Sequence, residues 1–127
     1  MAEGQDQGGS LRKPPVLAVE DSDGARVVRL AGELDLYNAS AVRQALFEAC
    51  SSGPPERVVV DLSEVDFIDS TALGVLIEAR TKLPNRKAFM LASAGLETKR
   101  ALQISGLDRH FAVHDTVPEA LQSDVGS

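Results

Sequence analysis

Asp69 and Ser70 lie where a strand-like segment gives way to a helical pattern of apolar residues. Both residue types are favoured helix N-caps, because their side-chain oxygens accept hydrogen bonds from the free N–H groups of the first turn. The same position permits a second chemistry, since a helix N-terminus offers N–H donors and partial positive charge that can hold a phosphate. Position alone therefore favours a capping role for Ser70 and leaves phosphorylation open.

A serine that acts as an enzymatic nucleophile needs a histidine base within hydrogen-bond reach and a third group that orients the base. Ser70 is flanked by Asp69 and Thr71, so the glycines of the Gly-x-Ser-x-Gly turn of serine hydrolases are missing. The chain also contains no Gly-x-x-x-x-Gly-Lys-Ser/Thr loop for nucleotide phosphates. We therefore expect a binding protein rather than an enzyme, and we expect no cofactor.

The nitrogen and sulfur side chains that could bind a metal are those of Cys50, His110 and His114. The two histidines are four residues apart, but the His-Glu-x-x-His pattern is absent and a strand is predicted between them. Three such side chains are too few for a four-ligand structural zinc site, so we expect no metal. A single cysteine cannot form an intrachain disulfide, which fits a reducing cytoplasm.

The elements that must position Ser70 begin with segments rich in β-branched residues. Val16–Glu20 and Ala25–Ala31 flank the turn-forming sequence Asp21-Ser22-Asp23-Gly24 and predict a hairpin. Arg57–Leu62 is a short run of the kind that is buried on both faces of a parallel sheet, and we expect it to be the central strand. Lys87–Ala92 predicts another buried strand.

Two segments have apolar residues at helical spacing. The first begins at a capping residue, Asn38 or Ser40, and ends near Gly53-Pro54-Pro55. The second begins at or beside Ser70 and is stopped by Pro84. The apolar positions are Ala39, Val42, Leu46 and Ala49 in the first segment and Leu73, Leu76 and Ile77 in the second.

Two further helices are predicted near the C-terminus. Lys99–Ile104 has Gly106 placed to end it in a left-handed cap, and a short edge strand at Phe111–Val113 follows. Thr116 and Glu119 have capping-box spacing, so a last helix should run from there to about Gln122. The alternation of strands and helices predicts an α/β fold, with a mixed, largely parallel sheet of four to five strands covered by about four helices.

Length and composition fit one globular domain. The chain has 127 residues, of which 43% are apolar and 25% charged. Its net charge of −6 disfavours a nucleic-acid partner.

Met1–Ser10 lacks the features of a secretory signal peptide, and no apolar run reaches the roughly 20 residues of a membrane-spanning helix. We expect a cytoplasmic protein that binds no membrane, with flexible tails at residues 1–14 and 123–127 and one domain over residues 15–122.

Three motifs resemble those of the STAS domain, the family named for sulphate transporters and anti-sigma-factor antagonists. Asp69-Ser70-Thr71-Ala72-Leu73-Gly74 is similar to the family's signature turn before a helix. Gly32-Glu33-Leu34-Asp35 resembles its first motif, and Ser105-Gly106-Leu107 resembles its third. Three motifs in order over about residues 16–122 are far more specific than one match. The resemblance implies a single STAS-like domain.

The chain departs from the family pattern at two places. Ala72 stands where many members have Gly, which raises the local helix propensity by about 1 kcal/mol. The connection Leu83–Lys87 is shorter than the Gly-containing loop that members often carry. Neither departure removes Asp69 or Ser70.

The resemblance also implies roles for individual residues. In the antagonists, the Ser that follows Asp in the signature motif is phosphorylated by the anti-sigma factor, which is itself a serine kinase. That position is Ser70 here, with Thr71 as the alternative acceptor. The partner-binding residues implied around it are Asp35, Asn38, Asp69, Thr71, Ala72 and Leu73. For Asp35 and Asn38 a purely structural interpretation stays open, in which their side chains close the turn before the first helix.

The function that the resemblance implies is that of an anti-sigma factor antagonist. Its unphosphorylated form would bind an anti-sigma factor serine kinase and free the sigma factor, phosphorylation of Ser70 would reverse this, and a serine phosphatase would reset the cycle. The alternative is a STAS scaffold, or a ligand-sensing regulatory domain in a stress-signalling complex.

Overall fold

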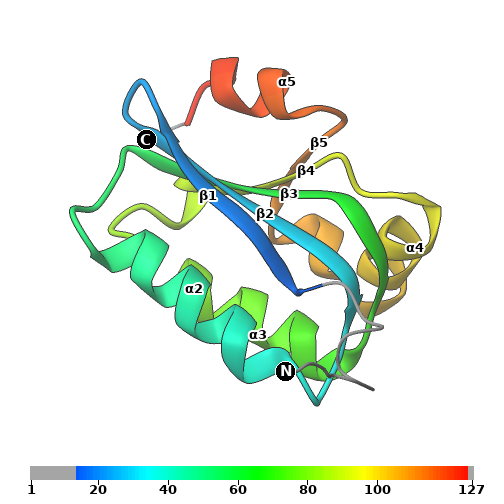
Figure 1. Cartoon of the computed structure of the whole chain (residues 1–127). Coiled ribbons are helices and arrows are strands. Elements are labelled where there is room, and N and C mark those ends of the chain that lie inside the picture. Colours follow the sequence, from blue (N-terminus) through cyan, green and yellow to red (C-terminus); the bar gives the residue numbers. More distant parts are fainter. Residues whose placement is uncertain (1–13, 126–127) are drawn as a thin grey trace, which may run out of the picture.

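The computed structural model describes residues 14–125 as a five-stranded sheet with helices on both faces (Figure 1). The strands follow one another across the sheet in chain order, with β1 and β2 antiparallel and every other neighbouring pair parallel. The strands are β1 (Val16–Ser22), β2 (Ala25–Leu34), β3 (Arg57–Ile68), β4 (Phe89–Ala92) and β5 (Ala112–His114). The predicted mixed sheet with β3 at its centre is confirmed.

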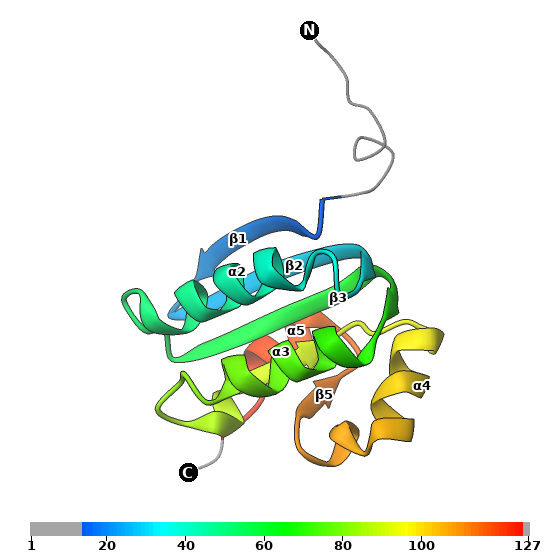
Figure 2. The ribbon, with the colours of Figure 1, turned by 90° about the horizontal axis from the view of Figure 1, so that it is seen from below.

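Four α-helices lie within residues 14–125, together with two short 3-10 helices. They are α2 (Ala39–Ser51), α3 (Ser70–Arg80), η1 (Arg86–Ala88), α4 (Leu96–Ser105), η2 (Leu107–Arg109) and α5 (Val117–Gln122). Helices α2, α3 and α4 cover one face of the sheet and α5 covers the other (Figures 1 and 2). None of the helices in this range has the length and apolar character needed to cross a bilayer.

The sheet divides the core into two layers. Val58 and Val60 of β3 face the larger layer, which α2, α3 and α4 complete, whereas Val59 faces the smaller layer under α5. Successive side chains of a strand point to opposite faces, so β3 is buried on both sides. Cys50 lies in the larger layer, where burial raises the pKa of its thiol to about 11 against a smaller opposing effect of Arg26. The thiol is therefore neutral at pH 7.

Strands β2 and β3 extend past their predicted ends at Ala31 and Leu62. Gly32-Glu33 and Ser63-Glu64 follow these positions and interrupt the apolar runs. In the structure the two strands continue to Leu34 and Ile68, which lie opposite each other in the parallel register. Register shifts interrupt the ladder between Arg29 and Ala31 and between Gly32 and Glu33.

The C-terminal half differs from prediction mainly at element boundaries. β4 begins at Phe89 rather than Lys87, because Arg86–Ala88 form a 3-10 turn in which the Asn85 side chain accepts a bond from the Lys87 N–H at 3.0 Å. Helix α4 is longer than the predicted Lys99–Ile104, and it ends as expected at Gly106 with φ of 79°.

The last helix is fixed to the sheet by Arg57. Its guanidinium donates to the carbonyls of Ala120 and Ser123 at 2.7 and 2.8 Å. The Thr116 half of the predicted capping box is present, with Thr116 Oγ1 accepting from the Glu119 N–H at 3.2 Å. Val125 packs against the core, whereas residues 1–13 and 126–127 of the predicted tails lie outside the described residues.

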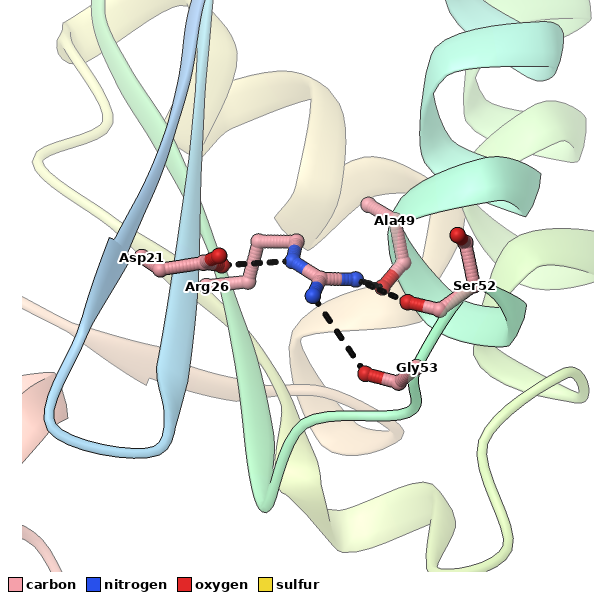
Figure 3. Close-up of polar contacts among 5 residues, drawn as sticks. All are labelled: Asp21, Arg26, Ala49, Ser52 and Gly53. Carbon is pink, nitrogen blue, oxygen red and sulfur yellow. Dashed lines mark hydrogen bonds and ion pairs between the residues drawn. The ribbon is translucent and has the colours of Figure 1, made fainter.

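Arg26 holds the end of α2 against the hairpin (Figure 3). Its Nε donates to Asp21 Oδ1 at 2.7 Å, and its Nη1 donates to the carbonyls of Ala49 and Ser52 at 2.8 and 2.7 Å. A longer bond of 3.3 Å reaches the Gly53 carbonyl. The last carbonyls of a helix have no partner within it, so Arg26 supplies donors that α2 lacks.

The buried side of α3 generates a stability prediction. Leu76 is 1% exposed and Ile77 is 38% exposed, although both belong to the predicted apolar face. We expect Leu76→Ala to lower the free energy of unfolding by about 2 to 5 kcal/mol, because it leaves a cavity. Ile77→Ala, the matched control one residue along, should cost less than about 1 kcal/mol. Urea denaturation measures both, and equal losses would contradict the observed orientation of α3.

Candidate functional site

The parallel pairing of β2 and β3 brings two loops together at the C-terminal edge of the sheet. Leu34 and Ile68 end their strands side by side, and the Asp69 N–H donates to the Leu34 carbonyl at 3.0 Å. The turn from Asp35 to Asn38 therefore begins next to the start of α3.

Asp69 joins these two loops through its carboxylate. Oδ1 accepts from the Ala72 N–H at 3.0 Å, which caps α3, and Oδ2 accepts from the Leu36 N–H at 3.1 Å. The backbone of Asp69 is extended, as expected at an N-cap. Of the two residues that could cap α3, the structure thus uses Asp69, and the capping role that position alone favoured for Ser70 is not observed.

Ser70 is the first residue of α3, and both Ser70 and Thr71 are exposed. The first N–H groups of an α-helix have no acceptor within the helix, and the helix dipole makes this end partially positive. Because Asp69 supplies the side-chain cap, the hydroxyl of Ser70 is available for other chemistry.

Ala72 and Leu73 point into the protein. They are 1% and 8% exposed and belong to the larger core layer. Their burial leaves almost no side-chain surface on which a partner could act. Ala72 and Leu73 were expected among the partner-binding residues, and in the structure they instead pack α3 against the core.

Asp35 and Asn38 close the turn between β2 and α2. Asn38 Oδ1 accepts from the Asp35 N–H at 2.9 Å, and Asn38 Nδ2 donates to the Glu33 carbonyl at 2.8 Å. Asp35 Oδ1 accepts from the Tyr37 N–H at 3.0 Å. Asn38 occupies the N-cap position of α2 but makes no side-chain capping bond, since its side chain is used in the turn.

The closed turn displays two apolar side chains that the sequence did not single out. Leu36 is 65% exposed and Tyr37 is 84% exposed, and Phe67, three residues before Ser70, is 51% exposed. The sequence does contain a signal for this surface, because an aliphatic and an aromatic residue, Leu36 and Tyr37, stand between the two residues that close the turn. Glu33 pairs with Phe67 across β2 and β3, so these exposed apolar residues lie in neighbouring segments. Exposed apolar patches are typical of interaction surfaces.

The same edge of the sheet is acidic. Glu33, Asp35, Glu64, Asp66 and Asp69 all lie in the two segments that meet there. Neither residues 30–42 nor residues 58–79 contain a lysine or an arginine. An anion added at Ser70 is therefore not neutralised by a cation from either segment.

The structure offers no histidine base to Ser70 from His110. The carbonyl of His110 accepts a bond from Arg80, the last residue of α3, at 2.6 Å. With a rise of about 1.5 Å per residue, that end of α3 is roughly 15 Å from Ser70. His114 lies in β5. Among residues 14–125 no three His, Cys, Asp or Glu side chains are arranged to hold a metal ion.

Comparison with known proteins finds relatives over most of the chain. The model of the STAS domain matches residues 16–120. The chain is 32% identical to the anti-sigma-F factor antagonist RsfB of Mycobacterium tuberculosis over 105 residues, which cover 83% of this chain and 85% of RsfB. It is 34% identical over 107 residues to the anti-sigma F factor antagonist of Paenibacillus polymyxa, covering 83% and 91% of the two chains.

A solved structure is similar in both sequence and shape. It is the crystal structure of an anti-sigma factor antagonist from Mycobacterium paratuberculosis, with 37% sequence identity and a TM-score of 0.75. The match covers 84% of this chain and 89% of that one.

The double role of Asp69 can be measured. Asp69→Ala removes the acceptor for both Ala72 and Leu36, so we expect it to lower the free energy of unfolding by about 1 to 3 kcal/mol. Asp69→Asn keeps one side-chain oxygen, so its free energy of unfolding should fall by less than that of Asp69→Ala. Asp108→Ala removes an exposed carboxylate elsewhere and serves as the control.

Hydrogen exchange separates the two bonds. In Asp69→Ala the amide of Leu36 should exchange faster than in the parent, because its acceptor is lost. Unchanged exchange at Leu36 would show that the carboxylate does not join the two loops.

Proposed function

The chain belongs to the STAS domain family, and on this premise we propose that it is an anti-sigma factor antagonist switched at Ser70. The unphosphorylated form binds an anti-sigma factor serine kinase and frees the sigma factor. Phosphorylation of Ser70 reverses the binding, and a serine phosphatase restores it. The observation that carries the proposal is an exposed Ser70 at the start of α3, whose helix is capped by a different residue.

The relatives support the antagonist role. RsfB and the Paenibacillus polymyxa protein are both named as antagonists of anti-sigma F factors, and each alignment covers 83% of this chain. Ser70 stands in the motif through which this chain resembles the family, and Thr71, also exposed, is the alternative acceptor. We place the cycle in the cytoplasm.

The fold can accept a phosphate at Ser70. The Asp69 carboxylate supplies the capping bond to the Ala72 N–H, so modification of Ser70 leaves this bond in place. A negative group at a helix N-terminus gains about 0.3 to 1 kcal/mol from the dipole. Repulsion from the neighbouring Asp69 carboxylate opposes this gain. The two effects have opposite signs, and the stability of the free protein should change little.

Binding responds differently because the phosphate would enter a contact surface. It adds a charge of about −1.5 to −2 beside Asp69 and the exposed Leu36 and Tyr37. A partner that covers this surface must desolvate the charge, and a poorly compensated buried charge commonly costs several kcal/mol. Each 1.4 kcal/mol corresponds to about a tenfold change in affinity.

The acceptor assignment is tested by phosphotransfer. Each purified anti-sigma factor kinase of the source organism is incubated with ATP and the parent, Ser70→Ala or Thr71→Ala protein. We expect one phosphate on the parent and on Thr71→Ala and none on Ser70→Ala, measured by intact mass and peptide mapping. Label on Thr71 with Ser70 unmodified would overturn the assignment.

The switch is tested by isothermal titration of the same kinase. Ser70→Ala should bind like the unphosphorylated parent, and Ser70→Asp should bind roughly 10- to 100-fold more weakly, since its charge is only partly desolvated. The phosphorylated parent should bind more weakly still. Ser70→Asn, similar in size to Asp but neutral, is the matched control.

Equal affinities of the Ala, Asn and Asp variants would show that charge at Ser70 does not control binding. Phosphorylation with no change in kinase affinity would favour the scaffold alternative.

A further inference from the structure

The two segments that meet at Ser70 supply no cation for a phosphate there. Residues 30–42 and 58–79 contain no lysine or arginine, and the four arginines that flank these segments each have a partner. The pairs are Arg29 with Asp61, Arg43 with Glu78, Arg57 with the Ala120 carbonyl and Arg80 with the His110 carbonyl. A phosphate on Ser70 therefore needs a counter-ion from another part of the chain.

The chain enters the sheet at the end where Ser70 lies. β1 is antiparallel to β2, so the start of β1 lies beside the end of β2. The Ala31 N–H donates to the Pro15 carbonyl at 3.0 Å. Leu34, whose carbonyl accepts the Asp69 N–H, is three residues beyond Ala31, or about 10 Å along an extended strand. The start of the sheet and Ser70 are thus separated by a short span of β2.

Arg12 and Lys13 directly precede the described residues. They are the only basic residues in the sequence 1–13. Arg12 is three residues before Pro15, and three extended residues span about 10 Å. The long side chain of an arginine adds to this reach. The chain before β1 is therefore long enough to bring a cation to Ser70 without any change in the sheet.

We propose that Arg12 and Lys13 are the counter-ions of phosphorylated Ser70, and that phosphorylation draws the N-terminal segment, residues 1–13, onto the start of α3. The proposal rests on the function proposed for Ser70 and adds how the phosphate is held. A phosphate brings three acceptor oxygens and a charge of about −1.5 to −2, and a guanidinium can pair with two such oxygens at once. The neighbouring Asp69 carboxylate increases the attraction, because a cation that approaches Ser70 meets two anions.

The consequence is a switch with two parts. The phosphate places charge in the surface that a partner would cover, and the N-terminal segment then occupies the space beside it. Phosphorylation thereby orders a segment of the same chain through new pairs between arginine or lysine and phosphate.

The test uses the full chain with phosphoserine incorporated at position 70 during translation, so that no kinase is needed. Phosphorus NMR follows the second pKa of the phosphate, which nearby cations lower and nearby carboxylates raise. The carboxylates at this end are those of Glu33, Asp35, Glu64, Asp66 and Asp69. Combining Arg12→Gln with Lys13→Gln should raise the phosphate pKa by roughly 0.3 to 1 pH unit, since two exposed ion pairs are lost.

Combining Arg86→Gln with Lys87→Gln is the matched control. It removes an adjacent, exposed Arg-Lys pair in η1, directly before β4. Phe89, the first residue of β4, pairs with Val58 near the start of β3, so this pair lies at the opposite end of the sheet from Ser70. The phosphate pKa should stay within about 0.1 pH unit of the parent phosphoprotein, because charges beyond a Debye length are screened.

Trypsin, which cleaves after Arg12, gives a second readout in the unsubstituted sequence. Cleavage there should be roughly 2- to 10-fold slower in the phosphoprotein than in the unphosphorylated parent at low ionic strength. The difference should disappear in NaCl at about 1 M, where the Debye length is about 3 Å.

An unchanged phosphate pKa in the Arg12 and Lys13 variant would overturn the proposal. A larger rise in Lys99→Gln would also overturn it, because the counter-ion would then come from α4, where Lys99 pairs with Asp115 at 3.9 Å. A phosphate pKa that depends on protein concentration would assign the cations to a second copy of the chain and overturn pairing within one chain. Absence of phosphotransfer by the kinase, with the expected pKa change present, would overturn the proposed function alone.

Discussion

The parallel pairing of β2 with β3 is the constraint from which the remaining arrangement follows. β3 is buried on both faces, and its register is therefore fixed by which valines face which core layer. A shift by one residue would turn Val58 and Val60 toward α5 and Val59 toward α2 and α3. With the register set, the ends of β2 and β3 meet, and the Asp69 carboxylate comes within reach of Leu36.

Much of the fold could be predicted because hydrophobic periodicity and turn residues act locally. The hairpin, the central strand, the four helices and the helix start at Ser70 follow from such patterns. The extensions of β2 and β3 do not, since their polar residues look like loop until a neighbouring strand is known to pair with them. Each extension is a strand only because the other pairs with it, and the local sequence of either segment does not contain this information.

The details of the site depended on contacts between distant residues. Asp69 and Ser70 are both good N-caps, and local sequence does not choose between them. In the structure Asp69 is the cap, and its carboxylate also accepts a bond from the Leu36 N–H, 33 residues earlier in the chain. Ile77 fitted the apolar pattern with Leu73 and Leu76 yet lies at the surface, because a helix on a sheet buries only the side that faces the sheet.

The arginine contacts lie at the other end of the sheet. Arg26, near the start of β2, and Arg57, the first residue of β3, hold the C-terminal ends of α2 and α5 through backbone carbonyls. The acceptors are backbone carbonyls, so these bonds do not depend on which side chains stand at the ends of the two helices. The molecule is thereby divided into an end whose arginines hold two helices through main-chain bonds and an end that carries Asp69 and Ser70, the proposed switch. Substitutions at the end that carries Asp69 and Ser70 leave these main-chain bonds in place, so the surface there can change in evolution without a new way to fold.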